Sequence, residues 1–113
     1  MEAGLVAGGG FARIETIGRR SRAARPVTVG FVEEADGSII VAASSASTAW
    51  AANLRADPAC RVVIGERSFD AVAEALDRDD HIRAIRALIL RYGTPAETLG
   101  RGPSFRLRRL VRG

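Results

Sequence analysis

Four arginines fall within seven residues near the N-terminus, in the segment 19–25 with the sequence RRSRAAR. An apolar run that alternates with polar residues, 11–17, precedes this segment, and a second apolar run begins at Val27. Because a guanidinium group donates several coplanar hydrogen bonds, arginines held on a rigid frame recognise phosphate or carboxylate. The sequence therefore predicts a cationic loop between two strands that binds an anionic ligand.

Two further groups of residues could take part in binding. Ser44 and Ser45 follow a predicted buried strand, and Trp50 and Asn53 share one face of a predicted short helix at i, i+3 spacing. If the first three predicted strands pair in order, the arginine loop and the two serines lie at the same end of the sheet. Backbone N–H groups at the start of the short helix would add positive potential there.

Residues for the commoner catalytic and metal sites are missing. The chain has one cysteine and one histidine, so it predicts no zinc site, no intramolecular disulfide and no Ser-His-Asp triad. Cys60 begins an apolar run and is predicted to be a buried core residue. The carboxylates at Asp77, Asp79 and Asp80 are predicted to form a helix N-terminus rather than a ligand set.

The hydrophobic patterning predicts a mainly β (α+β) protein in which six antiparallel strands curl into a small barrel with two flanking helices. Asp36-Gly37 predicts a tight hairpin turn, because both residues tolerate positive φ. Asp77 and Gly93 are predicted to begin and end the one long amphipathic helix. The predicted strands are residues 11–17, 27–34, 38–43, 61–64, 67–76 and 104–111, the predicted helices are 49–56 and 77–92, and 94–103 is a predicted loop.

The length of 113 residues predicts one domain, 11–113, preceded by a flexible N-terminal arm, 1–10. All 17 basic residues are arginine, a bias typical of a GC-rich genome, and the net charge of +4 favours anionic partners. No apolar run is long enough to span a bilayer, and no secretory signal is recognisable, so we expect a cytoplasmic protein.

Two motifs resemble those of the deazaflavin (F420)-dependent nitroreductases and F420H2-dependent quinone reductases. The segment 16–25 resembles the family pattern T-x-G-R-K-S-G-x-x-R, and the segment 50–58 resembles its W-x-x-N-L-x-A-x-P helix. The resemblance extends over roughly residues 11–111. It implies a six-stranded antiparallel split β-barrel of the FMN-binding type.

The resemblance also implies an enzyme that uses coenzyme F420. Such an enzyme transfers a hydride from the reduced deazaflavin to an electron-poor small molecule, namely a quinone, a nitroaromatic or an activated alkene. No side chain is then an obligate acid or base, although Ser44 and Ser45 are candidate proton donors. By motif, Arg19, Arg20 and Ser21 would hold the cofactor's phosphate and oligoglutamate tail, Thr28 and Val29 would line the deazaflavin, Ser44 and Ser45 would contact the ring or phosphate, and Trp50 and Asn53 would fix the helix that closes the pocket.

The sequence departs from the family pattern at several points. Arg20 stands in place of lysine, Arg22 in place of glycine, and Ala51 in place of a common tyrosine. The segment between Ser44 and Trp50 is shorter than in the better-known members. Arg22 in place of glycine implies a different backbone in the cofactor loop. The family's aromatic substrate residues near the C-terminus have no counterpart here, since Tyr92 is the single tyrosine, so the resemblance does not identify the acceptor.

Three alternatives remain open at this stage. The same barrel could hold FMN, or it could bind the deazaflavin without catalysis. A third alternative is an Arg-rich β-barrel that binds nucleic acid, since four arginines cluster near the C-terminus. The low aromatic content of 5% disfavours nucleic acid, because stacking platforms are scarce. The C-terminal arginines are Arg106, Arg108, Arg109 and Arg112.

Split barrels often pair through their sheets, so a homodimer is one expected state.

Overall fold

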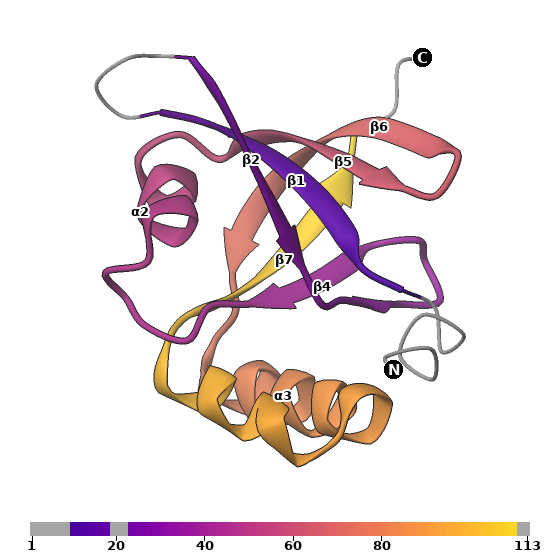
Figure 1. Cartoon of the computed structure of the whole chain (residues 1–113), viewed down its shortest axis with the longest axis vertical. Coiled ribbons are helices and arrows are strands. Elements are labelled where there is room, and N and C mark those ends of the chain that lie inside the picture. The colour runs from indigo at the N-terminus through magenta and orange to yellow at the C-terminus, as the bar shows by residue number, and fades with distance from the viewer. Residues whose placement is uncertain (1–9, 19–22, 111–113) are drawn as a thin grey trace.

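The computed structural model describes residues 10–18 and 23–110, and all seven strands within these ranges form one antiparallel sheet (Figure 1). Two α-helices and a 3-10 helix accompany the sheet. The elements are β1 (Ala12–Ile17), β2 (Ala24–Val29), β3 (Val32–Glu33), β4 (Ile39–Ala42), α2 (Ala49–Ala56), β5 (Ala59–Ile64), β6 (Arg67–Ala75), α3 (Arg78–Tyr92), η1 (Thr94–Arg101) and β7 (Ser104–Arg109). The strand order is β2-β1-β5-β6-β7-β4-β3, so the prediction of a curled antiparallel sheet is confirmed.

The prediction of one continuous strand over 27–34 is wrong. β2 begins earlier, at Ala24, and the chain then crosses at Gly30 and Phe31 to the opposite edge of the sheet, where β3 pairs with β4. A Cβ atom on Gly30 would lie 3.0 Å from the Tyr92 ring, and the Phe31 amide donates to the Tyr92 hydroxyl at 3.0 Å. These long-range contacts end β2, so the strands number seven rather than six. The predicted strand 27–34 therefore pairs with 11–17 through β2 and with 38–43 through β3, at opposite edges of the sheet.

The predicted hairpin turn, helix cap and helix stop are confirmed, whereas the predicted loop needs a correction. Gly37 has φ +90° in the hairpin between β3 and β4, and the Asp77 carboxylate accepts from the Asp80 amide at the start of α3. Gly93, with φ +92°, ends α3. Residues 94–103, predicted as a loop, contain η1 (Thr94–Arg101). Pro95 and Gly100 are loop signals in a sequence pattern, although proline is tolerated in the first turn of a helix.

The core fills the inner face of the sheet. Alternate residues of β1, β5 and β7 project into it, among them Ile14, Val62 and Leu107, which are fully buried. α2 covers part of this face, and its Trp50 ring lies 6.0 Å from the Phe105 ring. α3 covers the other face at β4, where Leu88 packs near Ala42 in a second, smaller cluster. The sheet therefore has α2 on one side and α3 on the other.

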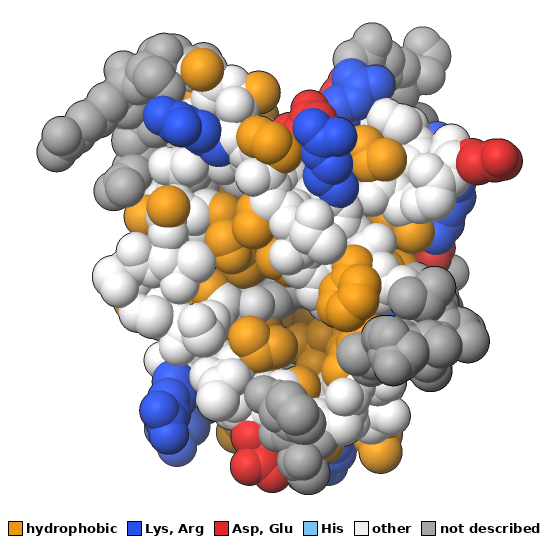
Figure 2. Space-filling view, viewed as in Figure 1, with side chains coloured by type: hydrophobic (Ala, Val, Ile, Leu, Met, Phe, Trp, Pro, Cys, Tyr) orange, Lys and Arg blue, Asp and Glu red, His pale blue; other side chains and the backbone are white. Residues whose placement is uncertain are grey.

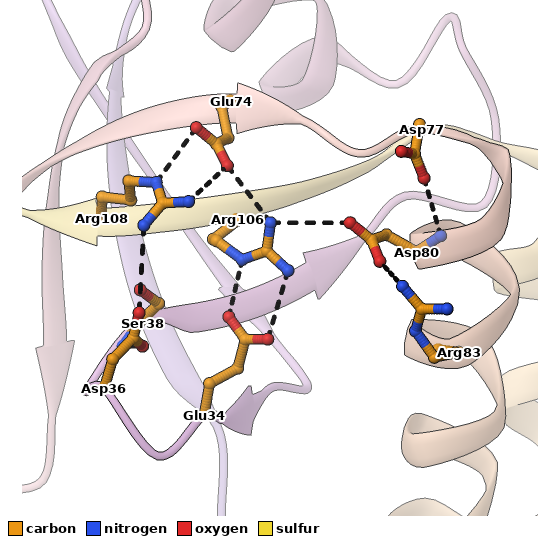
Figure 3. Close-up of polar contacts among 9 residues, drawn as sticks. All are labelled: Glu34, Asp36, Ser38, Glu74, Asp77, Asp80, Arg83, Arg106 and Arg108. Atoms are coloured by element: carbon orange, nitrogen blue, oxygen red, sulfur yellow. Dashed lines mark hydrogen bonds and ion pairs between the residues drawn. The ribbon is translucent and has the colours of Figure 1, made fainter.

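Arg106 on β7 joins three elements through ion pairs (Figure 3). Its guanidinium group contacts Glu34 beside the hairpin at 2.7 Å, Glu74 on β6 at 3.2 Å and Asp80 on α3 at 3.8 Å. Arg108 adds a second contact to Glu74 at 3.0 Å. The Arg106 side chain is only 17% exposed, so the centre of this network is shielded from solvent, whereas Arg108 and Glu74 at its edge are about half exposed.

Acid is expected to weaken this network. Hydrogen bonds from Arg108 and Arg106 hold the pKa of Glu74 below its usual value of 4.5. A carboxyl whose folded pKa is lowered stabilises the fold above its unfolded pKa and loses that effect as pH falls through the folded value. We expect Glu74→Gln to lower the melting temperature at pH 7, and we expect the difference from wild type to shrink as the pH falls below the usual carboxyl pKa of 4.5. A gap that stays constant across thermal melts in this pH range would contradict the assignment.

Candidate functional site

The two motifs that the sequence singles out meet in the folded chain. Asn53, on α2, donates from Nδ2 to the Oγ1 atom of Thr16, on β1, at 3.1 Å, although the two residues are 37 positions apart. Asn53 is 5% exposed and Thr16 is fully buried. Because a buried hydroxyl or amide without a partner is costly, this bond fixes α2 against the end of β1 that leads into the arginine segment.

The base of the arginine segment is also fixed. The Gly18 amide donates to the Ala23 carbonyl at 2.8 Å, and β1 pairs with β2 immediately beyond it. Arg19, Arg20 and Ser21, which carry the predicted anion grip, lie outside the described residues. The structure therefore describes the frame of this predicted loop rather than the loop itself.

Arg25 is a residue that the predicted site omits. It lies directly opposite Thr16 in the β1–β2 register, so the two side chains share the face of the sheet that carries Asn53. Arg25 is exposed and forms no ion pair with any other residue that the structure describes. A cation without a carboxylate partner at this position is available to an anionic ligand. Counting alternate residues back from Val27 along the strand would have identified it.

Thr28 and Val29 do not face the same way. Thr28 pairs with Arg13 and Val29 with Ala12, and neighbouring residues of a strand project to opposite faces. Val29, like Val27, packs against the core, whereas Thr28 lies on the outer face. Figure 2 shows apolar side chains gathered between α2 and β2. The valine side of β2 is therefore the side suited to a planar ring.

The Ser44–Ser45 corner is held in place by close backbone packing. The Ala43 amide donates to the Pro103 carbonyl at 2.9 Å, and Gly102 lies so near that a Cβ atom there would be 2.1 Å from the Ala43 carbonyl oxygen. Both serines are exposed. Their position suits contact with a bound molecule and not a role in the core.

The corner precedes α2, whereas Thr16, near the end of β1, contacts Asn53 in the later part of that helix. The Ser45 hydroxyl is 2.8 Å from that of Ser47, and Arg55 on α2 donates to the Ala46 carbonyl at 2.6 Å. Thr48 caps α2 by position but makes no side-chain hydrogen bond to it. The Ser44–Ser45 corner and the end of β1 therefore meet different parts of α2. Trp50, on the same helix, is buried in the core, where its ring lies beside that of Phe105.

The remaining reactive side chains are engaged elsewhere. Burial raises the pKa of the Cys60 thiol to about 12, so a thiolate nucleophile is excluded at neutral pH. The two ring nitrogens of His81 lie 2.7 Å from the Ser104 hydroxyl and 3.2 Å from the Gly100 carbonyl. Within the described ranges no three His, Cys, Asp or Glu residues gather as a metal site. In that same part of the chain, no helix is long and apolar enough to cross a membrane.

Comparison with known proteins assigns a family to this architecture. The family model described as F420H(2)-dependent quinone reductase matches residues 3–96. A search of curated protein sequences finds no significant match.

Solved structures that share the fold carry several different descriptions. An F420-H2 dependent reductase, FDR-A, is 23% identical with a TM-score of 0.73, over 87% of this chain and 93% of that one. The heme storage protein HutZ from Vibrio cholerae is 20% identical with a TM-score of 0.76, over 96% of this chain and 87% of that one. The conserved hypothetical protein Rv2991 from Mycobacterium tuberculosis is 21% identical with a TM-score of 0.76, over 95% and 77%. At these identities the structures show a common split-barrel fold.

Proposed function

Because this chain belongs to the F420H2-dependent quinone reductase family, we propose that it takes a hydride from reduced coenzyme F420 and passes it to an electron-poor small molecule. A quinone is the first acceptor to test, followed by nitroaromatics and activated alkenes. The observation that carries the proposal is the buried hydrogen bond from Asn53 to Thr16, which joins the two family motifs into one structural unit.

The donor chemistry of the described residues fits an anionic deazaflavin cofactor. Arg25 has no ion-pair partner among the described residues and lies beside the segment that holds Arg19, Arg20 and Ser21, and these four residues would bind the phosphate and the glutamate carboxylates. Val29 would pack against the deazaflavin ring from the core side of β2. Thr28, on the outer face, would reach the cofactor only through its backbone on this edge strand.

When bound, the reduced deazaflavin would supply a hydride from C5, and reduction of a quinone to the hydroquinone also consumes one proton. Ser44 and Ser45 are exposed at the corner before α2 and could relay a proton from solvent. No described side chain has to act as a nucleophile, in agreement with the buried state of Cys60. The protein's part is to orient the cofactor and the acceptor and to exclude water between them.

Heme binding, which the description of one structural neighbour states for that protein, is disfavoured in this chain. A heme iron is held by an axial side chain such as histidine or cysteine thiolate. His81 is the chain's single histidine, and both of its ring nitrogens already have partners. Cys60, the single cysteine, is buried in the core.

Titration with oxidised F420 and, separately, with FMN tests the proposal. We expect quenching of cofactor fluorescence that saturates at micromolar F420, with far weaker binding of FMN, because FMN lacks the glutamate tail. Turnover of reduced F420 with a soluble quinone under anaerobic conditions then distinguishes a reductase from a carrier. Saturable binding without oxidation by any acceptor class would establish the carrier alternative instead.

A further inference from the structure

The outer face of α3 carries apolar side chains that the fold leaves uncovered. Leu90 is 83% exposed and Ile82 is 48% exposed, although the opposite side of the same helix is buried through Ala84 and Leu88. Between α3 and η1 lies a groove of about 360 Å³ whose lining is mostly apolar. A protruding leucine beside an apolar groove is uncommon on a surface that only contacts water. The groove is lined by His81, Ile82, Ile85, Arg86, Ile89 and Gly100, with Leu90 at its edge.

Arginines surround these apolar residues. Arg78, Arg86 and Arg101 are exposed and form no ion pair with other described residues. Arg83 differs, because it pairs with Asp80. The carboxylates that share this face are Asp79 and Glu97, so the exposed charges on the face sum to a small positive value. An apolar stripe flanked by arginines is the pattern of a helix that lies in a membrane interface.

A second copy of the chain fits this face poorly. A two-fold axis through the apolar stripe would place Ile82 of one α3 opposite Leu90 of the other, since the stripe runs between these residues. The same axis would place Arg86 against its own counterpart in the middle of the contact. Like charges brought together in an apolar contact are destabilising, whereas an anionic surface would satisfy Arg86.

We propose that the outer face of α3, together with η1, docks the protein weakly on anionic lipid membranes. Leu90 and Ile82 enter the boundary between headgroups and acyl chains, and Arg78, Arg86 and Arg101 contact lipid phosphates. Figure 1 shows α3 at one end of the molecule, with the ends of β1 and β2 that flank the arginine segment at the other end. Docking through α3 therefore leaves the proposed cofactor site open to solvent.

Vesicle co-sedimentation tests this proposal without any cofactor. We expect the wild type to bind phosphatidylcholine vesicles that contain phosphatidylglycerol, and to bind pure phosphatidylcholine vesicles several-fold less. Leu90→Asp should reduce binding to the anionic vesicles about fivefold or more, and added salt should reduce the binding of the wild type. Leu110→Asp is the matched control, because Leu110 is 48% exposed but follows β7, away from α3, and this variant should bind like the wild type.

A site-specific fluorophore separates insertion from general charge attraction. Cys60 is buried with a raised pKa, so a dye that reacts with thiols should label Leu90→Cys selectively. We expect a blue shift of a polarity-sensitive dye at position 90 on adding anionic vesicles, and none at position 110.

Three results would overturn the proposal. One is a wild type that does not bind anionic vesicles. The second is a Leu90→Asp variant that binds them as the wild type does. The third is a wild-type dimer that Leu90→Asp converts to monomer, because the face would then be an interface between copies.

Discussion

Replacing Asn53 by leucine is expected to weaken F420 binding by about tenfold or more and to destabilise the fold by about 2 kcal/mol. Leucine is similar in shape to asparagine but cannot donate to Thr16, whose hydroxyl is fully buried. The hydroxyl would lose its partner, and α2 would no longer be fixed against the end of β1. The arginine segment follows that end directly, so its frame would loosen. Urea denaturation and F420 titration measure the two effects.

A second substitution separates the effect of this hydrogen bond on stability from its effect on F420 affinity. Thr16→Val removes the hydroxyl that Asn53→Leu leaves without a donor, so the double variant should recover part of the stability that the single Asn53 variant loses. F420 affinity should not recover, because α2 still lacks its link to β1. If the stable double variant bound F420 as tightly as the wild type does, the hydrogen bond would not position the cofactor site.

Gly102→Ala is expected to destabilise the protein by about 3 kcal/mol and to disturb the Ser44–Ser45 corner. The added Cβ would lie 2.1 Å from the Ala43 carbonyl oxygen and 2.6 Å from the Ser45 amide nitrogen. These atoms belong to the backbone, so no side chain can rotate away to make room. The strand end and the corner must move, and with them the two candidate proton donors. Denaturant unfolding measures the loss, and the turnover of F420H2 should fall with it.

Gly100→Ala is a matched control only two positions away. A Cβ at Gly100 meets just one side-chain atom, Ile85 Cγ2, at the ordinary contact distance of 3.8 Å. Its backbone is not in the left-handed region, so alanine should change stability by less than about 1 kcal/mol. Equal losses for the two variants would contradict the argument from close packing at Gly102.

The local parts of the fold could be predicted from the sequence, because their causes lie within a few residues. The Asp36-Gly37 hairpin, the Asp77 cap and the Gly93 stop of α3 each depend on the conformational preferences of neighbouring residues. The break between β2 and β3 could not be predicted in this way. It depends on Tyr92, whose hydroxyl bonds to Phe31 across 61 positions of sequence.

The candidate site also has some features that could be predicted from the sequence and others that could not. The family motifs identify which residues to examine, but the contact between Asn53 and Thr16 needs the sheet register before it can be seen. The opposite orientations of Thr28 and Val29 could have been predicted, because the period of two along a strand requires them. The motif also contains Arg25, whose face could have been predicted by counting alternate residues back from Val27, and its pairing with Thr16 agrees with that count.

The most direct test of the central claim is a comparison of F420 affinity between the wild type and Arg25→Gln, with FMN titrated in parallel. Arg25 is exposed and unpaired among the described residues, so the substitution should leave the melting temperature unchanged. We predict saturable micromolar binding of F420 to the wild type, a loss of about tenfold in the variant, and weak binding of FMN to both proteins. A wild type that fails to quench F420 fluorescence at tens of micromolar, or that binds FMN more tightly, would contradict the assignment of this chain as an F420-dependent reductase.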